Sequence, residues 1–200
     1  MNTDRFAHKA GSYEKNPKRV DNVVRIAETM LATLRLDPAM RIMDFGSGTG
    51  LLLEQIAPHV AHITAVDVSP SMNEQLRAKL DQLPCGVDIV ETDLTAHGLE
   101  QRFDGIISSM TLHHIQDIDA MLRRFHDHLV EGGFIALADL DQEDGSFHEE
   151  DTGVFHAGFE REALAAQARA AGFHEVRMSD ASVVNKPQGD YPVFLLTAYR

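Results

Sequence analysis

Glycines occupy positions 46, 48 and 50 of the segment Asp-Phe-Gly-Ser-Gly-Thr-Gly (44–50), which directly follows the short, mainly apolar run 41–43. The apolar run predicts a buried strand, and the leucine-rich segment 51–56 predicts a helix. A glycine turn between them exposes backbone N–H groups at a helix N-terminus, where a polar or charged ligand group can lie against bare backbone. Asp67 closes the next apolar run, at a place from which a carboxylate accepts hydrogen bonds from ribose hydroxyls. Together these features predict a nucleoside-containing cofactor.

Strand and helix patterns alternate along the chain. An amphipathic helix precedes the glycine turn and ends before Asp37. Helices are also expected after the glycine turn, from the Ser69 N-cap, over 118–129 and over 160–171. The predicted strands are 41–45, 62–67, 87–91, 103–108, 134–140, 174–178 and 193–199. Such alternation is typical of an α/β fold: a Rossmann-like, doubly wound, seven-stranded sheet, mostly parallel, with helices on both faces. Because no helix separates the last two strands, we expect them to form an antiparallel hairpin at one edge.

Charge and cysteine content restrict the partners. The chain has 18 Lys and Arg against 31 Asp and Glu, a net charge of −13 with its 11 His neutral. A surface this negative repels phosphate backbones, so nucleic acid is disfavoured as a partner. The single cysteine, Cys85, is typical of a reducing compartment. No signal-peptide core or membrane-length apolar run occurs in the sequence, which predicts a cytoplasmic protein without a membrane partner.

The spacing of the glycines distinguishes between cofactors. The dinucleotide fingerprint G-x-G-x-x-G requires a third glycine at the position that Leu51 occupies here. Asp44 precedes the turn, where its charge would repel a pyrophosphate and attract an ammonium group. These two residues count against NAD, FAD and ATP. They favour a cofactor that carries an amino-acid tail.

Further motifs follow in a fixed order. Val-Asp with Ser-Pro-Ser-Met spans 66–72, Glu-Thr-Asp-Leu spans 91–94, and Glu-Gly-Gly-Phe-Ile spans 131–135. With the glycine turn, these segments resemble the motifs of class I S-adenosylmethionine-dependent methyltransferases. The segment 103–115 is similar to the fourth motif of the UbiE/COQ5-like small-molecule branch of that family.

The resemblance implies roles for individual residues. Those that would bind S-adenosylmethionine are Asp44, Gly46, Ser47, Gly48, Gly50, Asp67, Val68, Met72, Asp93, Leu94 and Ser109, with Tyr13 closing over the site from an N-terminal lid. It also implies one methyltransferase domain over 1–200. Residues 1–37 would form the lid segment and helix, 38–140 the cofactor-binding core, and 141–200 an acceptor-side loop, helix and terminal hairpin.

Histidines are the candidate catalytic groups. His113 and His114 follow the fourth strand, and His148 and His156 lie in the acidic loop 141–158. A neutral imidazole near the methyl acceptor can take up a proton, although each of these residues can equally pack without chemical role. No histidine pair has metal-ligand spacing, and the fourth strand ends in Ser108-Ser109 without the acid that a magnesium site would need. We therefore expect no metal.

The sequence accordingly predicts in-line methyl transfer from S-adenosylmethionine to a small-molecule acceptor. Two alternatives stay open: a non-catalytic S-adenosylmethionine-binding sensor or assembly module, and an NAD(P)-dependent reductase. The acidic surface slightly favours an uncharged or cationic acceptor. The sequence does not identify the acceptor, the methylated atom or the oligomeric state.

Overall fold

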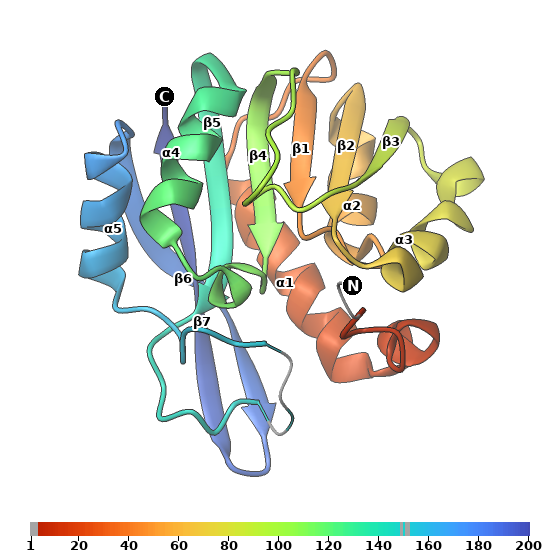
Figure 1. The fold of residues 1–200 in the computed structure, drawn as a ribbon, viewed down its shortest axis with the longest axis vertical. Coiled ribbons are helices and arrows are strands. Elements are labelled where there is room, and N and C mark those ends of the chain that lie inside the picture. The colour runs from red at the N-terminus through yellow and green to blue at the C-terminus, as the bar shows by residue number, and fades with distance from the viewer. Residues whose placement is uncertain (1–3, 149, 151–152) are drawn as a thin grey trace.

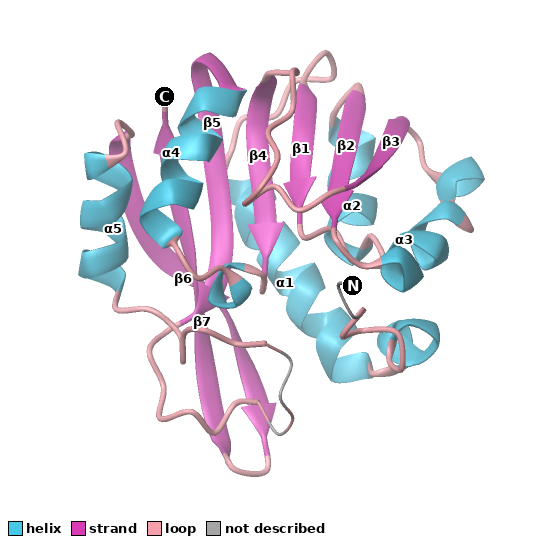
Figure 2. Cartoon of the chain, viewed as in Figure 1, coloured by secondary structure: helices cyan, strands magenta, loops and turns pink. Residues whose placement is uncertain are grey.

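The computed structural model describes residues 4–148, 150 and 153–200. Its seven strands form one sheet in the order β3-β2-β1-β4-β5-β7-β6 (Figures 1 and 2). The strands are β1 (Arg41–Phe45), β2 (His62–Asp67), β3 (Gly86–Glu91), β4 (Phe103–Ser109), β5 (Leu129–Leu140), β6 (His174–Lys186) and β7 (Gly189–Tyr199). Neighbouring strands from β3 to β5 are parallel, and β7 is antiparallel to both β5 and β6. The predicted fold class is confirmed.

The last three strands are longer than their apolar segments predicted. β5 begins at Leu129, five residues before the run that starts at Phe134. The hairpin strands β6 and β7 remain paired as far as Lys186 and Gly189. Most of the added length of β6 is polar and partly exposed, so it carries no hydrophobic signal, and backbone hydrogen bonds to β7 hold it. The hairpin therefore extends well beyond the end of the sheet (Figure 1).

Helices cover both faces of the sheet. They are α1 (Pro17–Thr33), α2 (Leu51–Ile56), α3 (Pro70–Arg77), α4 (Ile118–His128) and α5 (Arg161–Ala170). α4 and α5 lie on one face, and α1 and α2 lie on the other (Figure 1). Each face has its own buried apolar cluster, one built on α1 and α2 and one on α4 and α5.

Polar caps define where the helices start. The Asn16 side chain accepts hydrogen bonds from two backbone N–H groups of α1, and Pro17 occupies the first position. The Ser69 hydroxyl accepts from the N–H of Met72, as expected for an N-cap of α3. This cap places the start of α3 directly after Asp67, at the carboxyl end of β2.

Three segments lie beyond the carboxyl ends of the parallel strands. They are the N-terminal segment with its short helix Ala10–Lys15, the loop between β5 and α5, and the β6–β7 hairpin (Figure 1). Among its described residues, the loop has little regular structure apart from a bridge between Asp141 and Phe159. Ligands of open α/β sheets bind at this edge of the sheet. Within the described parts of the chain, no helix is both long and apolar enough to cross a membrane.

Candidate active site

A cavity of about 1330 Å³ lies at the carboxyl ends of the strands. At one end it is lined by the glycine turn and by the ends of β2 and β3. At the other end it is lined by the turn after β4, the loop after β5 and the hairpin tip, and residues of the N-terminal segment also line it. We call these the cofactor end and the acceptor end.

The glycine turn presents bare backbone to the cofactor end. Gly46, Gly48 and Gly50 have φ values of +70°, +54° and +89°, a region that L side chains rarely adopt. A Cβ atom at Gly46 or Gly50 would collide with the side chain of Thr111 or Leu76. A Cβ atom at Gly48 would meet nothing within 4 Å. Only Gly48 therefore leaves open space against its backbone. Gly50 does not line the cavity.

Two acids lie beside this turn. Asp44 is 1% exposed, and its Oδ2 atom has no hydrogen-bond partner among the described residues. Burial and the charge of Asp67 raise the pKa of Asp44 to about 8. Asp67 accepts hydrogen bonds from the N–H groups of Gly48 and Ser69, both at 2.8 Å, and burial raises its pKa. The turn thus lies beside a buried carboxyl group whose ionised form a cationic ligand group would stabilise.

Other polar atoms at the cofactor end are also left without protein partners. The hydroxyls of Ser47, Thr49 and Ser109 are buried without a hydrogen bond among the described residues. A buried polar group without a partner costs about 1–3 kcal/mol, which a ligand that satisfies it recovers. The open backbone at Gly48 and these unsatisfied atoms fit a polar ligand such as the methionine part of S-adenosylmethionine.

The remaining predicted cofactor residues line the same end. Val68 is 47% exposed, whereas Met72 and Leu94 are buried. The Asp93 carboxylate accepts from the N–H and hydroxyl of Thr95, which fixes the turn after β3. An apolar surface with one carboxylate at its edge suits a purine ring.

The N-terminal segment covers part of the cavity. Tyr13 lines it, and the Arg19 guanidinium lies 4.0 Å over the Tyr13 ring while donating to its carbonyl oxygen at 2.7 Å. Burial raises the pKa of Tyr13. Asp4, which sequence reasoning missed, accepts from the Ser69 hydroxyl at 2.8 Å and from the Ser71 N–H at 3.1 Å. Asp4 ties the N-terminal segment to α3 through contacts that no local sequence pattern predicts.

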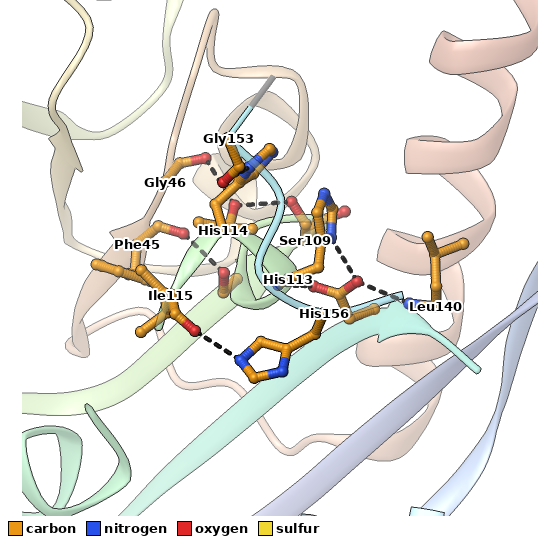
Figure 3. Close-up of polar contacts among 12 residues, drawn as sticks. Phe45, Gly46, Ser109, His113, His114, Ile115, Leu140, Gly153 and His156 are labelled. Carbon is orange, nitrogen blue, oxygen red and sulfur yellow. Dashed lines mark hydrogen bonds and ion pairs between the residues drawn. The ribbon is translucent and has the colours of Figure 1, made fainter. Parts of the chain in front are cut away.

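At the acceptor end, His113 pairs with an acid. Its Nδ1 lies 2.7 Å from Oδ1 of Asp139, and its backbone N–H donates to Oδ2 at 3.2 Å (Figure 3). Both side chains are almost fully buried. Asp139 belongs to β5 and is not among the residues that the sequence analysis singled out. Its position inside an otherwise apolar strand was the signal that could have identified it.

Two further histidine rings adjoin His113. The His114 ring lies 4.3 Å away and the His148 ring 4.9 Å away, measured between ring centroids. Burial and the neighbouring histidine charge lower the pKa of each to about 4, so both are neutral near pH 7. His148 Nε2 is buried without a hydrogen-bond partner among the described residues. All three residues line the cavity.

His156 lies elsewhere. Its Nε2 is 2.9 Å from the carbonyl oxygen of Ile115 (Figure 3). His156 does not line the cavity.

The described parts of the chain hold no group of three His, Cys, Asp or Glu side chains arranged to bind a metal ion.

Comparisons with known proteins agree with this geometry. Residues 42–133 match the family model described as a methyltransferase domain. The biotin biosynthesis bifunctional protein BioCD of Bordetella avium is 34% identical over 141 residues, covering 70% of this chain and 30% of the relative. The malonyl-[acyl-carrier protein] O-methyltransferase of Bacillus anthracis is 31% identical over 143 residues, covering 68% of this chain and 50% of the relative.

A solved structure shows the same fold. The N-methyltransferase NodS of Bradyrhizobium japonicum, in complex with S-adenosylhomocysteine, superposes with a TM-score of 0.75 at 15% identity. That superposition covers 100% of this chain and 99% of NodS. The chain spans about half the length or less of the two curated relatives above. Residues 42–133 are therefore similar to a methyltransferase domain, and the chain has the Rossmann-like fold of the NodS methyltransferase.

Proposed function

We propose that this protein is an S-adenosylmethionine-dependent methyltransferase that acts on a small-molecule acceptor. One observation carries the proposal: the glycine turn and the histidine cluster open into the same cavity. A cofactor at one end and an acceptor at the other would therefore meet within it. Holding the two reacting groups at near-attack distance while excluding water is the main task of a methyltransferase.

The residues of the cofactor end support this assignment. Gly48 would lie against the methionine part of S-adenosylmethionine, Asp44 would hold its ammonium group, and Asp67 would accept from its ribose hydroxyls. Asp93 and Leu94 would contact the adenine. S-adenosylmethionine supplies, when bound, an electrophilic methyl group on a positively charged sulfur.

His113 is the proposed proton acceptor. If Asp139 accepts the Nδ1–H of His113, the neutral ring keeps its lone pair on Nε2, which is free to accept a proton from an acceptor hydroxyl or amine. Asp139 also stabilises the imidazolium that results. The pKa values of His114 and His148 are lowered to about 4, so both are weak bases at neutral pH. His156 is not proposed for this role because it lies outside the cavity.

The relatives support methyl transfer without fixing the methylated atom. One is named an O-methyltransferase, and the similar structure is named an N-methyltransferase. The segment 103–115 supports a place in the UbiE/COQ5-like small-molecule branch.

A non-catalytic cofactor-binding module is the second candidate. It would keep the cofactor end and lose the acceptor end, whereas the cavity here continues past the glycine turn to His113, His114 and His148. This continuity favours the enzyme.

Calorimetry with S-adenosylhomocysteine and with NAD(H) tests the cofactor assignment. Binding of the former is expected; failure to bind it would overturn the proposal, and NAD(H) binding would favour a reductase. A methyl-transfer screen over small phenols, amines, carboxylic acids and quinone precursors then separates the enzyme from the binding module.

A further inference from the structure

Phe155 is the most exposed large apolar side chain among the described residues, at 57%. It belongs to the loop after β5 and lines the cavity. Val68, the next most exposed, lines the cofactor end, where the adenine is proposed to lie. Val183, 42% exposed on β6, does not line the cavity. An apolar side chain that faces a cavity instead of packing into the core is available to a ligand.

Backbone hydrogen bonds place Phe155 beside the proposed proton acceptor. The N–H of Phe155 donates to the carbonyl oxygen of His113 at 2.9 Å, and the N–H of His156 donates to the same oxygen at 3.3 Å. The His156 ring also reaches the carbonyl oxygen of Ile115 (Figure 3). The loop after β5 is therefore attached to the turn after β4 at the residue whose imidazole is the proposed base. The bond at Phe155 uses only its backbone and leaves its ring available.

Other aromatic rings lie around the same part of the cavity. Phe6 packs edge-on against His114, with ring centroids 5.7 Å apart, and Phe147 packs edge-on against His148 at 4.8 Å. All four residues line the cavity. Within the described parts of the chain, Phe155 takes part in no such ring contact. Apolar walls with a few placed polar groups are typical of small-molecule sites.

We propose that Phe155 binds an apolar group of the methyl acceptor, close to the atom that gives its proton to His113. This inference rests on the proposed function, because it concerns the acceptor of that reaction. The acceptor class that follows is a hydroxyl or amine compound with a hydrocarbon portion, as opposed to a wholly polar molecule. Phe155 takes no part in proton transfer. It determines specificity, because burying the hydrocarbon portion against its ring removes apolar surface from water.

A series of alcohols tests this contact in the complex with S-adenosylhomocysteine. The bound S-adenosylhomocysteine fills the cofactor end, so that the acceptor end stays open to the probes. The probes are the linear alcohols butanol, pentanol and hexanol, which share one hydroxyl and differ only in hydrocarbon length. Their dissociation constants are measured by the shifts of backbone amide signals in NMR titrations. We expect the affinity of the wild type to rise about two- to fourfold for each added methylene group.

Three variants assign this gain to the Phe155 ring. Phe155→Ser should reduce the gain from butanol to hexanol to less than about twofold, whereas Phe155→Leu keeps an apolar side chain and should retain most of it. Val183→Ser is the control, because it removes an exposed apolar side chain outside the cavity and should leave the gain unchanged. All three should bind S-adenosylhomocysteine as the wild type does, which also shows that they fold.

The dependence on chain length decides the outcome. A wild-type complex that binds none of the alcohols, or binds all three equally, overturns this inference and leaves the proposed function intact. An undiminished gain in Phe155→Ser, or an equal loss in Val183→Ser, also overturns it. Failure of the wild type to bind S-adenosylhomocysteine counts instead against the proposed function.

Discussion

Replacing Asp44 by Asn should stabilise the cofactor-free protein and make its stability less dependent on pH. Asp44 has an ordinary pKa of 3.8 when exposed, as in the unfolded chain, and a pKa of about 8 when folded. At a pH between these two pKa values, the Asp44 carboxyl group is protonated in the folded state and ionised in the unfolded state. Stability therefore falls as pH rises through this window, and the loss is complete above about pH 8.

The magnitude follows from the size of the pKa difference. A gap of about four pH units, at about 1.4 kcal/mol per unit, sets an upper limit near 6 kcal/mol for the cost of the ionised carboxylate. Water penetration and local relaxation reduce this limit. Between pH 5 and pH 7 we expect the free energy of unfolding of Asp44→Asn, relative to wild type, to rise by about 1–3 kcal/mol.

Urea denaturation of both proteins, stripped of cofactor, at pH 5, 6 and 7 measures this difference. The asparagine amide adds its own burial cost, but that cost does not vary with pH, so the slope is diagnostic. Asp21→Asn, at an exposed position of α1, is the control and should show no such slope. A difference between wild type and Asp44→Asn that stays constant with pH would refute the assignment of a buried, neutral Asp44.

The same substitution should weaken cofactor binding. An ammonium group beside Asp44 favours the ionised carboxylate, so binding below pH 8 releases a proton and strengthens as pH rises. Asp44→Asn removes this gain, and the affinity for S-adenosylhomocysteine should fall about tenfold or more at pH 7. A gain in stability paired with a loss of affinity is the pattern expected of a functional site.

The other predictions concern single residues of the cavity. Asp67→Ala should lower the affinity for S-adenosylhomocysteine by about 1–3 kcal/mol, because the ribose hydroxyls lose their hydrogen-bond acceptor. An affinity that calorimetry finds unchanged would show that Asp67 only holds backbone N–H groups. Gly48→Ala should fold with a loss of about 1–2 kcal/mol from its positive φ, yet its methyl group fills the open space and should reduce that affinity at least tenfold. Near-normal binding of S-adenosylhomocysteine by Gly48→Ala would contradict the proposal that the cofactor lies against the backbone of Gly48. Asp139→Asn should lower kcat far more than it changes KM or cofactor affinity, because Asp139 positions His113; parallel losses in all three would point to a structural role.

The sequence predicted most of the sheet because each parallel strand is a local signal. β1 and β2 begin and end at the expected residues, since a buried strand between helices is a short continuous apolar run. The hairpin was underestimated for the opposite reason. Its distal half is polar, and it is held by pairing with a strand that sequence patterns cannot place opposite it.

The two ends of the cavity differ in the same way. The glycine turn and Asp67 lie within one strand–helix–strand unit, so their spacing alone suggests a shared ligand. The contact between His113 and Asp139 joins residues 26 positions apart, and that between Lys18 and Asn185 joins residues 167 apart. Such contacts exist only once the chain has folded. The sequence therefore did not connect Asp139 with His113.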